Sequence, residues 1–286
     1  AEVIKIQEPG GSRRAQMEAA ATGAPTPAQQ RRTAAFDIFN RNKKSICLNL
    51  REESAKKIFH QLAEKSDVVL DGFRPGVVKR LGVDYDTLSK LNPRIIYCSI
   101  SGYGQDGPYS GLVGHDINYI SIGGALGIIG TPEGKPIIPY NLIGDYAGGG
   151  MNAVIGILLA LAARQKTGKG QYIDISMTDG VVGLMAPVFT EYFSSGTVVK
   201  PASTRLNGAV PYYNVYKCKD GRYISLGCNE PWFWDNLCKA IGREDFIPQM
   251  YATGEKRQEI FKVLRETFLT KTADDWFKDL FDKEVA

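Results

Sequence analysis

Histidine, clustered charge and paired cysteines are all scarce in this chain. Only two of its 286 residues are His, and its five cysteines have no C-x-x-C spacing, so the common ligand patterns of a zinc site are absent. The basic residues are scattered and the net charge is only +4. Such a distribution lacks the basic stripe of a nucleic-acid surface but suits a small anionic ligand. We therefore expect neither a bound metal nor a nucleic-acid partner.

Long apolar runs are also missing. The most apolar run, residues 151–163, contains Gly156 and is shorter than the about 20 residues that cross a bilayer. We therefore predict no membrane span and no membrane partner. Three of the cysteines lie in strand-like or helical apolar patterns, which predicts buried free thiols. Because free thiols are typical of a reducing compartment, the expected localisation is cytoplasmic.

The first part of the chain alternates between two periodicities. Near-continuous apolar runs are typical of buried parallel strands. Apolar residues such as Ile58 and Leu62 recur at helical spacing and predict a helix over 52–65. A second helix is predicted over 76–91, with a break near Gly82. The alternation predicts an α/β fold with a doubly wound, Rossmann-like parallel sheet. The expected strands are residues 3–6, 45–50, 67–70 and 95–100.

The rest of the chain predicts the end of this large domain, a linker and a second domain. We assign the large domain to residues 1–195, the linker to 196–211 and a smaller α+β domain to 212–286. A turn at 219–221 separates two alternating runs and indicates a β-hairpin. Residues 10–35, rich in Ala, Gly, Pro and Gln, predict a mobile loop. The other predicted elements are helices 146–164, 179–193, 231–241, 255–269 and 273–281, and strands 171–177, 212–218 and 222–227.

Residues 102–107 match G-x-G-x-x-G directly after a predicted strand. This pattern indicates dinucleotide binding when a helix opens immediately after it. Here Pro108 and Gly111 stand where that helix should begin, and Asp106 would face a pyrophosphate. An NAD-linked dehydrogenase is therefore the least favoured function.

Arginines and glycines follow the predicted strands, where ligands of open parallel sheets bind. Arg51 follows one strand, and Gly72 and Arg74 follow the next. Guanidinium groups beside glycine-opened backbone suit a ligand that carries phosphate. Turn glycines and solvated arginines are the plainer interpretation of the same residues.

His115 and Asp145 are the candidates for chemistry. An imidazole and a carboxylate on opposite sides of one carbon can remove a proton from one face and return it to the other, which inverts a stereocentre. Taken singly, His115 fits a half-buried structural histidine and Asp145 fits a helix N-cap. Glycines 148–150 would lie in the first turn of the helix predicted from Tyr146. Free N–H groups there are expected to stabilise the enolate oxygen of a bound thioester.

Seven motifs, in this order, resemble the class III CoA-transferase and racemase family, and within it the α-methylacyl-CoA racemase branch. The resemblance covers essentially the whole chain. It implies an acyl-CoA substrate, an interlaced homodimer and no cofactor beyond the CoA moiety of the substrate. The motifs are Glu2-Val-Ile-Lys-Ile6, Asn40-Arg-Asn-Lys-Lys-Ser45, Asp71-Gly-Phe-Arg-Pro-Gly76, Ser101-Gly-Tyr-Gly-Gln-Asp-Gly-Pro108, Gly114-His-Asp-Ile-Asn-Tyr119, Gly144-Asp-Tyr-Ala-Gly-Gly-Gly150 and Thr167-Gly-Lys-Gly-Gln171.

The resemblance also implies residue roles. His115 and Asp145 match the proton-transferring pair, and Glu230 matches an acid that assists from the small domain. Pro231 allows the plainer interpretation that Glu230 only begins a helix. The residues that match CoA-holding positions of the racemases are Leu48, Asn49, Leu50, Arg51, Gly72, Phe73, Arg74, Arg80, Gly114, Asp116, Ile117, Asn118 and Tyr119.

The presence of His115 favours an isomerase that inverts carbon 2 of a 2-methyl-branched acyl-CoA, because transferases of the family usually lack this His. The alternative is CoA transfer between carboxylic acids through a covalent intermediate on Asp145. The family normally has a strand and a helix before residue 2 and a further C-terminal segment. We therefore expect both domains to be incomplete, and a noncatalytic acyl-CoA-binding fragment is the third hypothesis.

Overall fold

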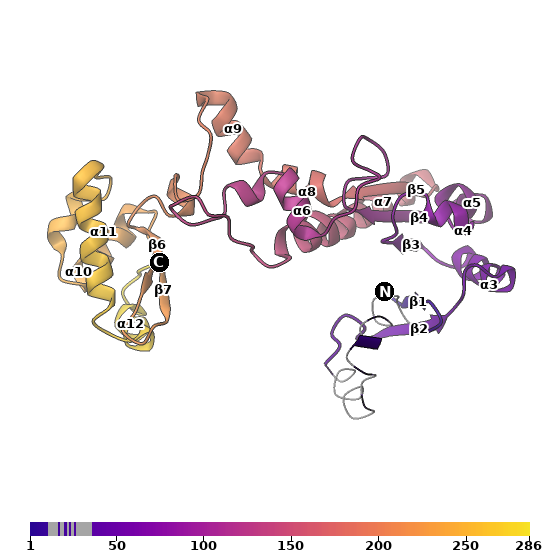
Figure 1. Cartoon of the computed structure of the whole chain (residues 1–286), viewed down its shortest axis with the longest axis horizontal. Helices are drawn as coiled ribbons and strands as arrows, with labels where there is room; N and C mark the ends of the chain where they lie inside the picture. Colours follow the sequence, from indigo (N-terminus) through magenta and orange to yellow (C-terminus); the bar gives the residue numbers. More distant parts are fainter. Residues whose placement is uncertain (11–16, 18–19, 22, 24–25, 27–35) are drawn as a thin grey trace. The chain divides into compact units, whose positions relative to one another are not determined.

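The computed structural model describes residues 1–10, 17, 20–21, 23, 26 and 36–286 (Figure 1). Most of the loop predicted over 10–35 lies outside these residues. The chain divides into two compact units, each made of two stretches. Unit 1 is Ala1–Val113 with Gly149–Met177, and unit 2 is Gly114–Gly148 with Thr178–Ala286. The domain limits inferred from the sequence remain a prediction.

The described residues of unit 1 form two parallel sheets, whereas one continuous sheet was expected. β1 (Val3–Gln7) pairs with β2 (Lys43–Cys47), and β3 (Val68–Asp71), β4 (Ile96–Ser101) and β5 (Gln171–Ser176) form a second sheet in that order. The prediction of parallel strands is confirmed. β4 is buried along almost its whole length, but β1 and β2 are mostly exposed. Apolar side chains therefore do not lead to burial in every strand of this unit.

Helices cover both faces of the β3-β4-β5 sheet. α3 (Glu53–Glu64) and α5 (Tyr85–Leu91) contribute Ala63 and Leu88 to a buried cluster that contains Tyr97 of β4. α7 (Asn152–Thr167) packs against β4 and β5, where a Cβ on Gly156 would lie 3.1 Å from Ile173. Successive residues of a strand point to opposite faces, so these helices occupy opposite sides. α4 (Val77–Leu81) ends at Gly82, whose φ of 67° makes the predicted break.

The helix predicted over 146–164 is longer than the sequence indicated. A π-helical segment, labelled η2 (Leu142–Met151), precedes α7, and together they form 26 helical residues. By length and composition alone this segment could cross a membrane. The apolar run of 151–163, from which no membrane span was predicted, is only part of this helical segment. Core helices of globular proteins have the same properties, and α7 packs on its sheet.

In unit 2, a small apolar cluster joins α6 (Asp116–Ile122), the 3-10 turn η1 (Ala125–Gly127), η2, α8 (Met177–Leu184) and α9 (Ala186–Ser195). A Cβ on Gly180 would lie 2.3 Å from the carbonyl oxygen of Gly148, so η2 and α8 touch backbone to backbone. The helix predicted over 179–193 is two helices that meet at Met185. α6 was not predicted. The cluster is Ile120, Ala125, Val181 and Met185, with Ile143 and Phe189 packed against it.

Residues 210–285 of unit 2 surround a larger core, which we call the C-terminal core. The predicted hairpin is confirmed as β6 (Tyr213–Lys217) and β7 (Tyr223–Gly227), which are antiparallel. Figure 1 shows the hairpin beside the C-terminal helices, in orange and yellow. Thr272 caps the last helix by accepting from the Asp275 N–H at 3.2 Å, as its sequence indicated. The other elements are η3 (Arg205–Asn207), α10 (Pro231–Ala240), η4 (Glu244–Gln249), α11 (Gly254–Phe268) and α12 (Ala273–Leu280).

All five cysteines are free thiols, and four of them are buried as predicted, whereas Cys47 is exposed. Burial raises the pKa of the Cys98 thiol to about 11. Burial likewise raises the pKa of Cys228 to about 11 and that of Cys238 to about 12. These thiols are therefore neutral components of the cores near pH 7.

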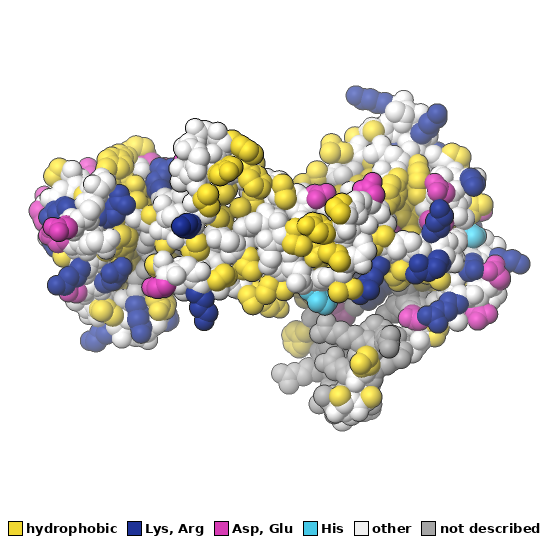
Figure 2. Space-filling model, turned by 45° about the horizontal axis from the view of Figure 1, so that its top comes forward, with side chains coloured by type: hydrophobic (Ala, Val, Ile, Leu, Met, Phe, Trp, Pro, Cys, Tyr) yellow, Lys and Arg dark blue, Asp and Glu magenta, His cyan; other side chains and the backbone are white. Residues whose placement is uncertain are grey.

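Many apolar side chains remain at the surface, and Figure 2 shows several groups of them in yellow on the face in view. α7 exposes Val154, Ile155, Leu158 and Leu159, each by more than half. Phe193 of α9 is 80% exposed. Apolar side chains on successive turns of one helix are typical of a surface that another molecule covers.

Candidate active site

His115 is the N-cap of α6, with extended backbone angles of −132° and 178°. Its backbone N–H donates to Oδ1 of Asn118 at 3.1 Å, so the side chain three residues along the helix fixes the entry of the chain. The His115 residue itself is exposed. Its imidazole is therefore available to a ligand. The alternative interpretation, a half-buried structural histidine, does not agree with this exposure.

Asp145 lies inside the first turn of η2 and is not its N-cap. The sequence-based interpretation as a cap before Tyr146 is therefore wrong, because the helix begins earlier, at Leu142. The carboxylate is half-buried and its Oδ2 accepts a hydrogen bond from Nδ2 of Asn141 at 3.0 Å. This bond orients the carboxylate relative to the start of the helix.

Asp116 supplies the cap that Asp145 does not. Its Oδ2 accepts from the backbone N–H groups of Gly144 at 2.7 Å and Asp145 at 2.9 Å. These two donors have no partner within the helix, since they belong to its first turn. Asp116 directly follows His115, so the segment that presents the imidazole is bonded to the segment that presents the Asp145 carboxylate. Both segments also contribute to the apolar cluster of Ile120 and Ile143.

From the sequence, glycines 148–150 were expected in the first turn of a helix. The structure does not place them there. They lie within η2, where backbone N–H groups are used by the helix itself. The expected enolate site at these residues is therefore wrong in its placement. The contact with Gly180 gives Gly148 a different physical reason, because a side chain at either position would separate η2 from α8.

Glu230 is the N-cap of α10, and Pro231 is the first residue of that helix, as predicted. The Glu230 carboxylate makes no capping hydrogen bond and the residue is half-buried. Its negative charge contributes, after burial, to the raised pKa of Cys228. A carboxylate that does not stabilise its own helix terminus is available for another interaction.

The predicted CoA-holding residues of unit 1 follow β2 and β3. Leu48 is buried, and its N–H donates to the Gln7 carbonyl at 2.9 Å. Asn49 forms a side-chain turn by accepting from the Arg51 N–H at 3.2 Å. Asp71 forms a similar turn by accepting from the Phe73 N–H at 2.8 Å. The remaining members of this group, Leu50, Gly72, Arg74 and Arg80, are half-buried or exposed.

The three arginines of this group, Arg51, Arg74 and Arg80, are exposed. None of them forms an ion pair within the part of the chain that the structure describes. The Arg80 guanidinium lies near Gly76, where an added Cβ would be 3.5 Å from its Nη1. Unpaired guanidinium groups near a sheet edge are suited to an anionic ligand.

The predicted CoA-holding segment of unit 2, residues 114–119, is partly occupied by its own contacts. The Tyr119 hydroxyl donates to the Gly114 carbonyl at 2.6 Å, and Tyr119 is only 8% exposed. Asp116 is equally buried, whereas Ile117 and Asn118 are exposed. Contact of these residues with CoA remains a prediction.

The G-x-G-x-x-G segment continues as turns until α6 begins at Asp116. The N–H of Gln105 donates to Oδ2 of Asp174 at 2.8 Å. A dinucleotide-binding turn opens directly into a helix and points its N–H groups at pyrophosphate. This loop has neither property, so the exclusion of a nicotinamide site is consistent with its geometry.

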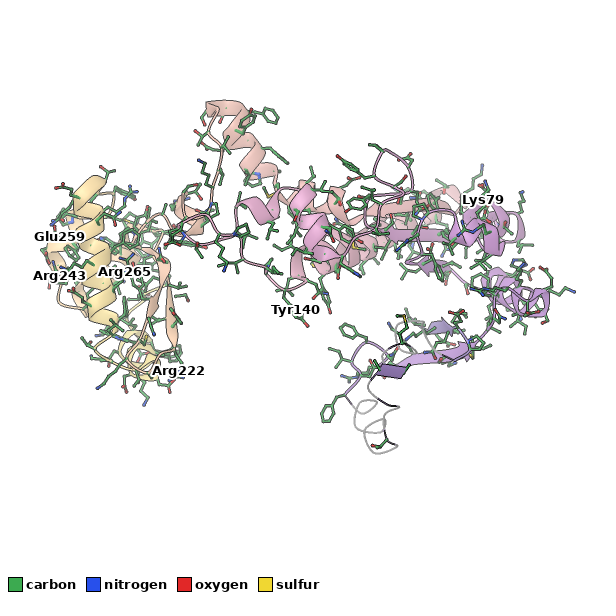
Figure 3. All side chains as sticks on the ribbon, viewed as in Figure 1. Lys79, Tyr140, Arg222, Arg243, Glu259 and Arg265 are labelled. Atoms are coloured by element: carbon green, nitrogen blue, oxygen red, sulfur yellow. The ribbon has the colours of Figure 1, made fainter. Side chains whose placement is uncertain are left out.

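Two residues of the site were not assigned these roles from the sequence. Asn141 was not considered, and Asp116 was assigned to CoA and not to the helix start. Asn141 precedes η2, where an Asn is a common capping residue, and this was its only local signal. Asp116 gives no local signal, because its partners are 28 and 29 residues away. Beside them, Tyr140 has a φ of 60°, is 76% exposed and points away from the ribbon (Figure 3).

The whole chain, residues 1–286, matches the profile of CoA-transferase family III. The chain belongs to this family. The resemblance found in the seven sequence motifs is thereby confirmed at the level of the family.

Relatives with two kinds of activity in their names are almost equally similar to it. The human alpha-methylacyl-CoA racemase is 35% identical over 250 residues, which cover 86% of this chain and 65% of that protein. The acetyl-CoA:oxalate CoA-transferase of Acetobacter aceti is 34% identical over 246 residues, or 85% of this chain and 60% of that protein. The chain thus spans less than two thirds of either relative. Identity does not separate a racemase from a transferase here.

The crystal structure of a CaiB/BaiF family protein from Brucella suis superposes with a TM-score of 0.80 and 28% identity. The match covers 100% of this chain and 75% of that one. The mixed α/β fold with parallel sheets is therefore the fold of the CaiB/BaiF family.

Proposed function

We propose that this chain carries the proton-transferring site of a racemase that inverts carbon 2 of a 2-methyl-branched acyl-CoA. The observation that carries the proposal is the bonding of the His115 segment to the Asp145 segment through the Asp116 carboxylate. An imidazole and a carboxylate presented by two joined helix starts are suited to a two-base reaction, because one group can be protonated while the other is not. Membership of a CoA-transferase family supports the thioester substrate.

In the proposed reaction, the thioester carbonyl acidifies the hydrogen on carbon 2. His115 or Asp145 removes this proton and leaves an enolate, and the other group delivers a proton to the opposite face. The two roles exchange with the handedness of the substrate. Glu230 assists as a further acid. No cofactor beyond the CoA moiety takes part.

We assign recognition of the CoA phosphates to Arg51, Arg74 and Arg80, together with the loop residues beside them. Their guanidinium groups have no ion-pair partner among the described residues. A charge-assisted bond to phosphate gives such groups the partner that the chain itself does not provide.

We further propose that the protein acts as a homodimer in which Glu230 of one copy completes the site of the other. The exposed apolar side chains of α7 in unit 1, and separately those of α9 in unit 2, are of the kind that a second copy covers. Sedimentation of the full-length protein as an active monomer would contradict this. The free thiols support a reducing compartment, so we propose a cytoplasmic location, which fractionation of the source cells would test.

CoA transfer is the second candidate, and the 34% identity to an oxalate CoA-transferase favours it. In this reaction the Asp145 carboxylate attacks the thioester carbonyl and expels CoA as a thiolate, which leaves a mixed anhydride. The thiolate then attacks the Asp145 carbonyl of the anhydride, releases the free acid and forms an aspartyl-CoA thioester. Hydroxylamine modifies Asp145 only on this covalent path.

The decisive experiment gives separate enantiomers of a 2-methylacyl-CoA to the enzyme in deuterated water. His115→Ala and Asp145→Ala should each lower inversion at least about 100-fold, since each removes one of two required proton-transfer groups. Each variant should still exchange the hydrogen of one enantiomer. The matched control is Asp282→Ala, which removes an exposed carboxylate outside the proposed site. Undiminished inversion by His115→Ala, or robust CoA transfer by it, contradicts the racemase and favours the transferase.

A further inference from the structure

The Asp116 carboxylate is an unusual way to start a helix, because it comes from another element of the chain. It is 5% exposed, and a single oxygen, Oδ2, accepts from two consecutive N–H groups 28 and 29 residues away. Most helix caps are formed by a residue next to the helix. Here the start of η2 is fixed by a residue on α6.

Gly144 is what allows this approach. A Cβ at Gly144 would lie 2.8 Å from Oδ2 of Asp116 and 3.2 Å from its Cγ. Real Cβ atoms essentially never come that close, so a side chain here would push the carboxylate away from the helix start. The carboxylate of Asp116 therefore caps η2 only because residue 144 is a glycine. Either residue can be substituted separately to disturb this cap.

The two proposed proton-transfer groups depend on the Asp116 cap to different degrees. The backbone N–H of Asp145 is bonded directly to Asp116. His115 is instead held by the bond from its own N–H to Asn118. Removal of the Asp116 side chain thus frees the Asp145 backbone but leaves the bond that fixes the His115 backbone.

We propose that Asp116 is a positioning residue that sets the Asp145 carboxylate against one face of the substrate. This inference rests on the proposed racemase function. It differs from the role that the family resemblance implies for Asp116, which is contact with CoA. Positioning of Asp145 alters the rate of one proton transfer, whereas contact with CoA alters affinity.

The Asp116→Asn variant separates geometry from charge. Oδ1 of Asp116 is buried and has no hydrogen-bond partner among the described residues. An asparagine can place its oxygen at the Oδ2 position, where both N–H groups remain satisfied, and its NH2 group then replaces an oxygen that accepts no hydrogen bond. If the role is positioning, this substitution should restore most of what Asp116→Ala loses.

The test measures deuterium exchange and inversion separately for each enantiomer in the full-length enzyme. Asp145→Ala first identifies the enantiomer whose exchange depends on Asp145. For that enantiomer, kcat of Asp116→Ala should fall about 100-fold with little change in KM, because a displacement near 1 Å has effects of that size. Exchange of the other enantiomer should stay within a few-fold of the unaltered enzyme. Gly144→Ala should give the same asymmetry with the carboxylate retained.

Three results overturn the proposal. These are equal losses for both enantiomers, an Asp116→Asn variant as impaired as Asp116→Ala, or a change confined to KM, which would restore the role in CoA contact. Asp84→Ala is the matched control, because it also removes a capping carboxylate, that of α5 in unit 1, whereas Asp116 and Asp145 lie in unit 2. If Asp116→Ala does not fold, Gly144→Ala and Asp116→Asn decide the question.

Failure of the racemase proposal gives a different result. The unaltered enzyme then exchanges neither enantiomer, and the same variants are measured for CoA transfer and for hydroxylamine trapping at Asp145. Positioning of Asp145 predicts that Asp116→Ala lowers kcat of transfer about 100-fold while Asp116→Asn restores it. Unchanged transfer by Asp116→Ala would overturn the positioning role in that case also.

Discussion

The arginines around the C-terminal core form ion pairs within the chain, whereas those that follow β2 and β3 do not. In the C-terminal core, Arg222 pairs with Asp220 and Asp274, and Arg243 pairs with Asp245 while its guanidinium lies 3.6 Å from the centre of the Phe246 ring. Figure 3 labels both arginines. The exposed Arg51, Arg74 and Arg80, which follow β2 and β3 in the chain, form no ion pair in the described part of the chain. The difference separates arginines whose charge is already paired within the fold from arginines whose charge can pair with a ligand.

The largest expected effect is on the core itself. Phe268 is fully buried and packs against Tyr216 and Trp276, so Phe268→Ala should lower the free energy of unfolding by about 3–5 kcal/mol. Urea unfolding at pH 7 measures this value. Phe281→Ala is the matched control, because Phe281 is 69% exposed. Equal losses for the two variants would show that this core does not hold the region together.

Arg80→Ala should weaken CoA binding by about 1.5–3 kcal/mol, the usual value of a hydrogen bond to a charged group. It should leave the unfolding transition and kcat nearly unchanged. Calorimetric titration with CoA measures the affinity. Lys79→Ala controls for the loss of one nearby positive charge, and Arg222→Ala should instead leave CoA affinity intact. An Arg80→Ala variant that binds CoA normally would break the comparison between paired and unpaired arginines.

The smallest expected effect concerns alkaline pH. The folded pKa values of Cys98 and Cys228, about 11, lie above the ordinary value of 9.0. The unfolded chain therefore releases these protons first, so their contribution to stability is complete below pH 9.0 and is lost as the pH rises through 11. Urea unfolding at pH 7 and pH 10 measures the loss. Cys228→Ala should reduce this pH dependence, whereas Cys47→Ala, which removes an exposed thiol, should not.

Sequence patterns predicted the elements whose signals are local. The β6-β7 hairpin followed from a turn of three residues, the start of α12 from Thr272 and Asp275, and the break after α4 from Gly82. Each of these features depends only on neighbouring residues, so a single sequence is sufficient to predict it. The same holds for His115 and Asp145 as candidates, because their residue types alone suggested acid–base chemistry.

Features that depend on distant partners were missed. η2 begins at Leu142 and not at Tyr146, because a carboxylate from α6 satisfies its first N–H groups. Gly148 suggested an oxyanion site, but its neighbour is Gly180, 32 positions further along the chain. The division of the strands into two sheets was also missed, because the pairing of β1 with β2 joins residues 40 positions apart, such as Val3 and Lys43. Local patterns predict which helix or strand forms, but not the distant residues against which it packs or to which it is hydrogen-bonded.

The pairing of β4 with β5 has a consequence for how the protein is made. Ile96 pairs with Gln171, so the ribosome must add 75 residues before the middle strand of this sheet obtains its second neighbour. At the usual 5–20 residues per second, one edge of β4 waits for about 4–15 s. During that interval a nascent strand of mostly apolar side chains has an open edge, which is the form most prone to pair with another chain. The C-terminal core is contiguous and has no such delay, so chaperone demand should be concentrated on the interval between the synthesis of β4 and that of β5.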